Sequence, residues 1–454
     1  MSKMKSIRVL GLVLAAMMFV SVFAACGDAV QTPAAGTEQT PATGTEQTPA
    51  ASGTTVSDPT ALKPATITMW GWNPGDIQKI FDEYSKTYAG DTLNYVTVQQ
   101  TEAFQKLQTT VSAGLELPDI VPSEIGQRGT MIKLDIWEDL SKAPYNFDSS
   151  MVFDYLLPLL KNDRGELVCT PWDITTAALA YKRPIAKQYL GSDDPAEVQK
   201  AITSWEDVLN KGKEINQKSG GKVFMFASLN DVRILMDGQN PAPIVQDGTL
   251  SLDSVKTTLA TMANFRDNNI VDNISSTSPA YNASYPDETH LLYPCASWSP
   301  QYVIAPNDPN GAGKWGLIVP PGGAFSWGGS GHMIPKDAKN KENAFRFINW
   351  LVTKDGAISQ RQTVGYNMAN KAMYEDPQYI TLSDKNFGDQ NLGQIFFVDA
   401  LKNIHPRPVS AYDVIIADTW SLVTEALNND RSMTADAAVK MFETEFRNKA
   451  PEVK

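Results

Sequence analysis

Cysteine and histidine are both scarce in this chain, with three of each in 454 residues. No spacing among them fits a zinc site, which takes several closely placed Cys or His ligands. The chain also lacks a glycine-rich phosphate loop, a nucleophile elbow, an HExxH motif and a recognisable Ser/His/Asp arrangement. These absences argue against the commonest classes of metalloenzyme and hydrolase. We therefore expect neither a metal nor a cofactor.

Positive charge is also in short supply. The chain has 39 Lys and Arg residues against 51 Asp and Glu residues, and its formal net charge is −12. No basic patch and no run of alternating basic and aromatic residues occurs. A protein with this balance is a poor partner for nucleic acid or for an anionic membrane surface.

The first 25 residues read as an export signal. Lys3, Lys5 and Arg8 precede an apolar run over residues 9–23 and two small residues, as in a bacterial signal peptide. The sequence FAAC at residues 23–26 resembles a lipobox, in which Cys26 becomes the first mature residue and carries the lipid. A plain secretory signal and a single membrane anchor are the alternatives, although the run is short for a membrane span. We expect an exported protein that is lipid-anchored to the outer face of the cell membrane.

Residues 26–62 comprise this cysteine and a low-complexity tether. The unit TPAAGTEQ at residues 32–39 is nearly repeated at residues 40–47. A segment with so few large apolar residues cannot bury enough surface to offset its ordering entropy, so we expect it to stay disordered. Cys169 and Cys295 are the other two cysteines, and the sequence leaves open whether they form a disulfide or remain buried free thiols.

Residues 63–454 are too many for one ordinary core and suggest two lobes. Alternating residues 66–71 predict a strand, Asn73 and Pro74 predict a helix start, and residues 93–98 and 117–121 predict two further strands. This β-α-β-α order is typical of a parallel sheet, whose ligands bind beyond the carboxyl ends of the strands.

Two residues of this first lobe are expected at that edge of the sheet. Trp72 follows the first strand and precedes a Pro-Gly turn, and Glu124 follows the third strand. Trp70, at the end of the first strand, could equally lie in the core.

The stretch LVCTPWDITTAALAYK at residues 167–182 consists of two apolar segments around a break. Pro171 cannot donate to a sheet ladder, so pairing is interrupted where Trp172 and Asp173 lie. If the chain passes between lobes here, these two residues face a cleft, and a flat ring beside a double acceptor suits a sugar. The alternative is a surface turn with Trp172 plugging a core.

Other tryptophans separate into two groups. Trp327 lies between two Gly-Gly pairs that follow a strand stopped by prolines, a place where the chain can bend. Trp205 follows a capping box at residues 203–207 and Trp350 lies in an amphipathic helix, so both are expected to be structural.

Several motifs occur in an order that resembles family 1 extracellular solute-binding proteins, the sugar-binding lipoproteins of ABC importers, which include maltose-binding protein. The motifs are the lipobox, the tether, TITMW, LPDIV, CTPWD, TSWEDVL, SWGGSGHMIP and KNKENAFRFINWL. The resemblance implies an α/β fold with two lobes, each a mainly parallel sheet flanked by helices, joined by hinge strands. It places residues 63–173 and 323–368 in the N-terminal lobe and residues 174–322 and 369–454 in the C-terminal lobe.

The resemblance also implies which residues contact the ligand. Trp327 would face the cleft at a hinge crossing, and Trp298 would stack on sugar, although Pro294 and Cys295 depart from the family pattern there. Tyr366 and Tyr412 would supply a third aromatic wall. The complete expected ligand site is Trp72, Glu124, Trp172, Asp173, Trp298, Trp327, Tyr366 and Tyr412.

The function expected from the sequence is capture of a carbohydrate, an oligosaccharide by preference, and its delivery to the permease subunits of an ABC transporter. The protein would be a monomer and not an enzyme. The alternatives are a binding protein for a non-sugar solute such as a peptide or polyamine, a surface glycosidase, and a purely structural surface lipoprotein. A glycosidase would need two carboxylates across a sugar cleft, which the sequence alone does not exclude.

Overall fold

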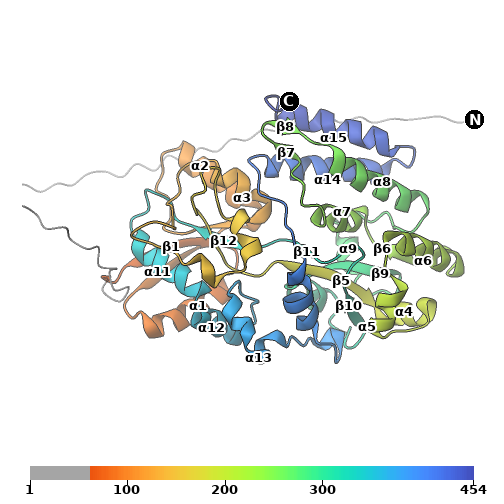
Figure 1. The fold of residues 1–454 in the computed structure, drawn as a ribbon, viewed down its shortest axis with the longest axis horizontal. Coiled ribbons are helices and arrows are strands. Elements are labelled where there is room, and N and C mark those ends of the chain that lie inside the picture. Colours follow the sequence, from red (N-terminus) through yellow and green to blue (C-terminus); the bar gives the residue numbers. More distant parts are fainter. Residues whose placement is uncertain (1–61) are drawn as a thin grey trace, which may run out of the picture. The chain divides into compact units, whose positions relative to one another are not determined.

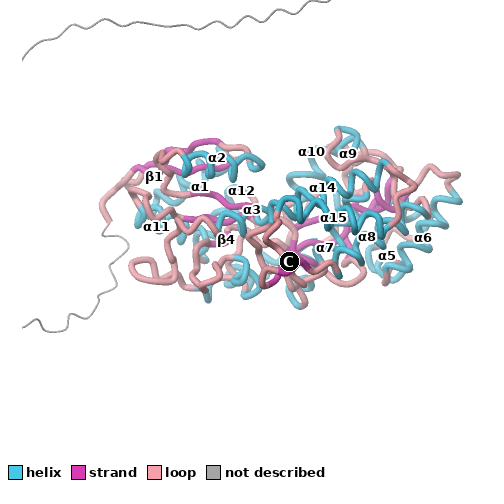
Figure 2. Tube along the Cα trace, turned by 90° about the horizontal axis from the view of Figure 1, so that it is seen from above, coloured by secondary structure: helices cyan, strands magenta, loops and turns pink. Residues whose placement is uncertain are grey.

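The computed structural model describes residues 62–454, and Cys26 and the tether lie outside this range. The described chain is a mixed α/β structure with helices packed around its sheets (Figure 1). The five-stranded sheet lies in one lobe, and the sheets β1-β2 and β3-β12-β4 lie in the other. Figure 2 shows α1, α2, α11 and α12 grouped around β1, and α5 to α8, α14 and α15 grouped at the other end. The two-lobe α/β architecture expected from the sequence is confirmed.

The first lobe begins as the sequence predicts. The first two strands pair in parallel, and Ile120 makes a further parallel bridge to Met69. Helix α1 starts with a proline and buries Ile77, Ile80 and Phe81 along one face, because apolar residues recur at helical spacing. The elements are β1 (Thr66–Gly71), α1 (Pro74–Thr87), β2 (Thr92–Thr97), α2 (Ala103–Ser112), β3 (Val121–Glu124) and α3 (Ile125–Ile132).

The strand predicted at residues 117–121 lies later in the chain, at β3. Pro118 has no N–H to donate, and the side chain of Asp119 accepts a hydrogen bond from the Thr68 N–H at 2.9 Å. Pairing therefore begins only at Ile120 and continues with an antiparallel partner. This partner is β12 (Ser330–Met333), which also pairs with β4 (Thr170–Pro171) and leads into α11 (Lys341–Val352) and α12 (Lys354–Val364).

The second sheet has the order β10-β5-β9-β6, with β11 also on β5. Only β6 and β9 pair in parallel here, so the expectation of a mainly parallel second sheet was wrong. In the first lobe the same expectation holds for β1 and β2 but not for β12, which pairs antiparallel with β3 and β4. The chain enters the second lobe along β5 and returns toward the first lobe along β10 and β11, and strands of opposite direction must pair antiparallel. The strands are β5 (Thr176–Lys182), β6 (Phe224–Phe226), β9 (His290–Ala296), β10 (Trp315–Ile318) and β11 (Phe325–Ser326).

The remaining helices cover the second sheet and the crossing between the sheets. Helix α14 packs on α15 and also touches α3 of the first lobe. A short hairpin is formed by β7 (Val245–Gln246) and β8 (Thr249–Leu250). The helices are α4 (Arg183–Leu190), α5 (Pro195–Ala201), α6 (Trp205–Lys218), α7 (Leu229–Gly238), α8 (Asp253–Asp267), α9 (Pro279–Ala283), α10 (Ala305–Asn307), α13 (Pro377–Ile380), α14 (Asp413–Asn429) and α15 (Ala435–Lys449).

Two apolar clusters form the core. One fills the first lobe and continues onto one face of the second sheet, where it includes Tyr293 and Trp315. The other covers the opposite face of the second sheet and includes Leu179, Phe226 and Trp420. Both described cysteines are buried free thiols, so the disulfide alternative is not realised.

Three tryptophans with an expected structural role, or an open one, lie in the core or pack against it. Trp70 is only 6% exposed. Trp350 is buried with its ring 5.6 Å from that of Tyr84, and Trp205 packs near Phe265 behind a capping box in which Ser204 and Asp207 bond each other's backbone N–H groups. The structural role predicted for Trp205 and Trp350 is confirmed.

Two linkers run side by side where the chain passes between the sheets. One joins β4 to β5 and the other joins β11 to β12. The Trp172 N–H donates to the Ser330 carbonyl and the Trp327 N–H donates to the Thr175 carbonyl, each at 2.9 Å. The interruption of pairing after Pro171 is therefore real, and the linkers bond each other in place of the sheet ladder.

Candidate functional site

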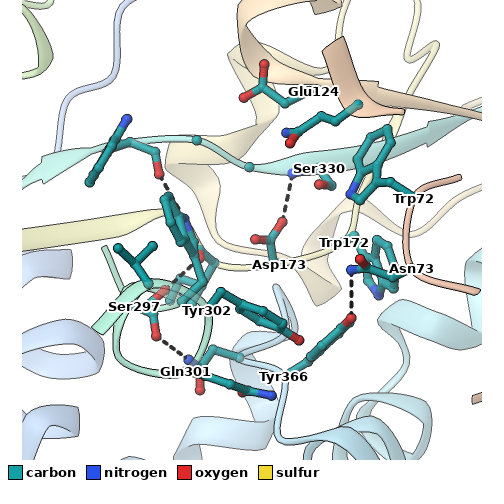
Figure 3. Close-up of a pocket in the computed structure, with 18 of the residues that line it drawn as sticks. Trp72, Asn73, Glu124, Trp172, Asp173, Ser297, Gln301, Tyr302, Ser330 and Tyr366 are labelled. Atoms are coloured by element: carbon teal, nitrogen blue, oxygen red, sulfur yellow. Dashed lines mark hydrogen bonds between the residues drawn. The ribbon is translucent and has the colours of Figure 1, made fainter. Parts of the chain in front are cut away.

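A cavity of about 520 Å³ lies beside the two linkers, a size within the usual range for small-molecule sites. Its walls come from the end of β1, the two linkers, the turn after β9 and the turn after α12 (Figure 3). The structure brings together here all but one of the residues that the sequence predicts for the ligand site. They are Trp72, Glu124, Trp172, Asp173, Trp298, Trp327 and Tyr366.

Tyr412 is the exception. It lies at the N-terminus of α14 and its ring packs 6.0 Å from that of Phe446, and it does not line this cavity. Its position in the chain, just before a helix, gave no topological reason to place it at the carboxyl end of a strand. The expectation for Tyr412 rested on the resemblance alone, and the structure gives it a packing contact instead.

Three half-buried tryptophans present ring surface to the cavity. Trp72 follows β1, while Trp298 and Trp327 form a tilted pair with ring centroids 5.1 Å apart. The indole N–H of Trp298 donates to the Trp327 carbonyl at 3.4 Å. This contact joins the turn after β9 to the returning linker, so the two rings are held in one arrangement.

Trp172 both faces the cavity and packs in the core, the two roles that the sequence left open. It lines the cavity, yet only 6% of it is exposed. Its indole N–H donates to Gln360 Oε1 at 2.8 Å, and its ring packs against His332 and Tyr366. Most of this side chain is therefore core, and the part that faces the cavity is fixed by that packing.

Two carboxylates face the same space. Glu124 caps helix α3, with Oε2 accepting from the Gly126 N–H at 2.7 Å. Asp173 accepts from the Ser330 N–H at 2.8 Å. Burial raises the pKa of the Asp173 carboxyl to about 6 and also raises the pKa of the Glu124 carboxyl, since an apolar surrounding disfavours the charged form.

The backbone around these carboxylates requires glycine. Gly328 and Gly329 have φ angles of 74° and 119°, a region that side chains with a Cβ rarely adopt. A Cβ on Gly329 would lie 2.2 Å from Cγ2 of Thr175. The close approach of the two linkers therefore depends on this residue being glycine.

Several functional residues were missed by the sequence reasoning. Asn73 occupies the N-cap position of α1, but its side chain makes no cap bond and donates instead to the Tyr366 hydroxyl at 3.0 Å. The Tyr366 hydroxyl in turn donates to Asp76 Oδ2 at 3.0 Å. Asn73 read as an ordinary helix cap because its true partner is 293 residues away.

A short π-helix after β9, Pro300–Ile304, adds Tyr302 and Gln301 to the cavity wall. Tyr302 is 41% exposed and its ring lies 6.1 Å from that of Tyr366. Gln301 donates to the Val364 carbonyl at 3.3 Å, and Asn367 donates to the Ser297 carbonyl at 2.9 Å. These contacts link the second lobe to the turn after α12, and no sequence signal beyond proximity to Trp298 indicated them.

Arg128 was also overlooked, because an arginine in a short helix usually faces solvent. Here it is only 3% exposed. Its Nε donates to Ser123 Oγ at 3.1 Å, and Nη2 donates to the carbonyls of Ser123 and Gly329 at 3.2 and 2.9 Å. It therefore holds the returning linker against the first lobe from behind the cavity.

The arrangement is suited to binding more than to chemistry. Among the described residues, no group of three or more Cys, His, Asp or Glu side chains is placed to hold a metal ion. The described residues that line the cavity include no Lys, Arg or His. What remains is flat aromatic surface, amide and hydroxyl groups, and two carboxylates.

The burial of Asp173 predicts a stability effect that depends on pH. Its native pKa of about 6 lies above the ordinary 3.8, so the favourable contribution of the protonated form is present below pH 3.8 and is lost as pH rises through 6. Asp173→Asn keeps the acceptor for Ser330. It should raise the unfolding free energy of the ligand-free protein by about 1–2 kcal/mol at pH 8, after allowance for partial exposure of the side chain. Urea unfolding at pH 8 and pH 4 checks this, and an equal gain at both values would contradict it.

A family model described as "Bacterial extracellular solute-binding protein" matches residues 79–386 of the chain. No similar sequence was found among curated proteins. Within the described residues, no helix is both long enough and apolar enough to span a membrane.

Solved structures share the fold at low sequence identity. One described as an extracellular solute-binding protein of family 1 is 21% identical, has a TM-score of 0.78, and aligns over 85% of this chain and 100% of its own. The sugar-binding protein MalE from Xanthomonas citri is 17% identical, with a TM-score of 0.69 and coverages of 85% and 98%. A transporter-associated binding protein from B. animalis subsp. lactis Bl-04, solved with β-1,6-galactobiose, is 19% identical, with a TM-score of 0.66 and coverages of 86% and 98%. The chain belongs to the bacterial extracellular solute-binding proteins.

Proposed function

We propose that this protein captures a carbohydrate, by preference an oligosaccharide, between two closing lobes and delivers it to the permease of an ABC transporter. The single observation that supports this most is the cavity with three half-buried tryptophans and two carboxylates. Sugar rings have an apolar C–H face and a rim of hydroxyls. They therefore need flat hydrophobic partners with directional acceptors around them.

The proposed lobes are residues 63–173 with 323–368, and residues 174–322 with 369–454. Packing supports most of this division, because β12 pairs with β3 and α12 packs on α1. Helix α14 touches both α3 and α7, so it borders both lobes. The linkers around Pro171 and Gly329 are the proposed hinges, and domain closure at such hinges is the usual response of two-lobe binding proteins to ligand.

The alternative ligands differ in what they require of the cavity. A peptide or an anionic solute calls for a cation, and none lines the cavity among the described residues. A polyamine could use the two carboxylates and could place its ammonium groups over the tryptophan faces, so spermidine is measured beside the saccharides. A glycosidase would hydrolyse its oligosaccharide. Analysis of the oligosaccharide after incubation with the protein therefore distinguishes hydrolysis from binding.

A thermal-shift screen against mono- and oligosaccharides, followed by calorimetry, tests the proposal. A true ligand at 100 times its Kd should stabilise the protein by about 2.7 kcal/mol. Trp298→Ala should weaken binding of the tightest saccharide at least tenfold, which is about 1.4 kcal/mol. The reason is that this change removes one stacking face and leaves most of the fold untouched.

Trp205→Ala is the matched control for this variant. Trp205 is also a half-buried tryptophan of the second lobe but packs on Phe265 away from the cavity, so it should lower the melting temperature and spare affinity. Loss of folding in Trp298→Ala, with full affinity in the molecules that stay folded, would show that the saccharide is placed wrongly. No stabilisation by any saccharide in the panel would overturn the carbohydrate proposal itself.

Lipid attachment at Cys26 is the second part of the proposal, and this residue lies outside the described part of the chain. It follows a short apolar run and precedes the tether. Cys26→Ala should release the exported protein from the membrane without changing its affinity for ligand, since the tether is remote in sequence from every cavity residue. Fractionation of cells that express each form is the measurement, and unchanged membrane retention would reject the anchor.

A further inference from the structure

The charged side chains that line the cavity are both carboxylates. Glu124 and Asp173 line it, and both are held in place by backbone N–H groups rather than by a cation. Asp76 does not line the cavity; it accepts from the hydroxyl of Tyr366 and forms a salt bridge with the exposed Lys79 at 3.7 Å. No lysine, arginine or histidine lines the cavity within the described residues.

Arg128 is a cation whose charge acts on both Glu124 and Asp173, and its placement is decisive. Its charge opposes the burial effect on both carboxyl groups. It nevertheless does not line the cavity, since Nε and Nη2 are turned to Ser123 and to the Gly329 carbonyl and the side chain is 3% exposed. An anionic group in the cavity would therefore meet carboxylates without reaching a guanidinium.

From this geometry we infer that the cavity selects its saccharide by charge. Glu124 and Asp173 reject sugars that carry a carboxylate, phosphate or sulfate, and accept neutral sugars or sugars with a free amino group. This inference rests on the proposed function, because it concerns the ligand of the same cavity. The physical reason is that like charges in a partly desolvated site repel strongly, and discrimination between partners is commonly achieved by such a repulsive element.

The same groups should make the selection depend on pH. Asp173, with its pKa of about 6, is mostly ionised at pH 7.5 and mostly protonated at pH 5. A sugar carboxylate, by comparison with simple carboxyl groups, remains ionised at both values. The repulsion should therefore weaken as pH falls. The titratable or charged groups that interact with Asp173 are Glu124, Arg128, Tyr155, Tyr302 and Tyr374, and burial raises the pKa of each of these three tyrosines well above this range.

The test uses three matched ligands. They are the tightest neutral saccharide of the panel, its uronic-acid counterpart and its aminodeoxy counterpart, each measured by calorimetry at pH 7.5 and pH 5. At pH 7.5 the uronate should bind at least tenfold more weakly than the neutral sugar, and the amino sugar at least as tightly. At pH 5 the ratio of the Kd of the uronate to the Kd of the neutral sugar should be at least threefold smaller than at pH 7.5.

Variants locate the effect. The double variant Glu124→Gln with Asp173→Asn should lower the ratio of the two Kd values at pH 7.5. Glu206 is an exposed carboxylate on α6, so Glu206→Gln should leave this ratio unchanged. A uronate that binds the wild-type protein as tightly as the neutral sugar at pH 7.5 would overturn the inference. A ratio of the two dissociation constants that is the same at pH 7.5 and pH 5 would also overturn it. Either result would leave the carbohydrate proposal intact. Binding of spermidine without binding of any saccharide would contradict both the inference and the carbohydrate proposal.

Discussion

The structure depends on the contact between the two linkers that cross between the lobes. Asp173 on one linker accepts the Ser330 N–H of the other, and Trp172 and Trp327 donate across in both directions. Arg128 then ties the Gly329 carbonyl to the first lobe. The two linkers thus form one wall of the cavity, which we call the floor, and the cavity lies beside the points where each linker leaves a sheet. Because a Cβ at Gly329 would collide with Thr175, the floor tolerates little change.

This floor places polar groups where they are costly. Asp173 and Glu124 are partly withdrawn from water, and Arg128 offsets only part of the effect of burial on their pKa values. The ring nitrogens of the buried His332 have no hydrogen-bond partner in the described structure. Burial lowers the pKa of His332 to about 3, so it remains neutral against the ring of Trp172. Such groups reduce stability, and they are retained here beside a cavity, which is where proteins commonly accept that cost.

Much of the site was predictable because topology alone places the ends of strands. Trp72 and Glu124 follow strands of the first lobe, Trp298 follows β9, and Trp172 and Trp327 lie at breaks marked by proline and glycine. Local signals were sufficient for Trp72, Glu124 and Trp172, as they were for the capping box at Ser204. The prediction that Trp298 and Trp327 face the cleft came from the family resemblance.

The remainder depends on contacts between distant segments, which one sequence does not reveal. Asn73 bonds Tyr366 instead of capping its helix, and Arg128 turns inward to a carbonyl 201 residues away. Tyr302 lies in a short π-helix, Pro300–Ile304, that no sequence pattern indicated. The antiparallel pairing of β10 and β11 with β5 follows from how the chain re-enters the first lobe. The hydrophobicity of these strands is compatible with either direction. Tyr412 shows the converse, since a family resemblance without a topological reason named a residue that does not line this cavity.

The central claim is that the tryptophan-walled cavity holds a saccharide. The most direct measurement is the crystal structure of the protein with the tightest saccharide of the panel. The account predicts a sugar ring stacked on Trp298 or Trp327 with a hydroxyl bonded to Asp173 or Glu124. A saccharide bound elsewhere, with these rings still in contact only with each other, would contradict it.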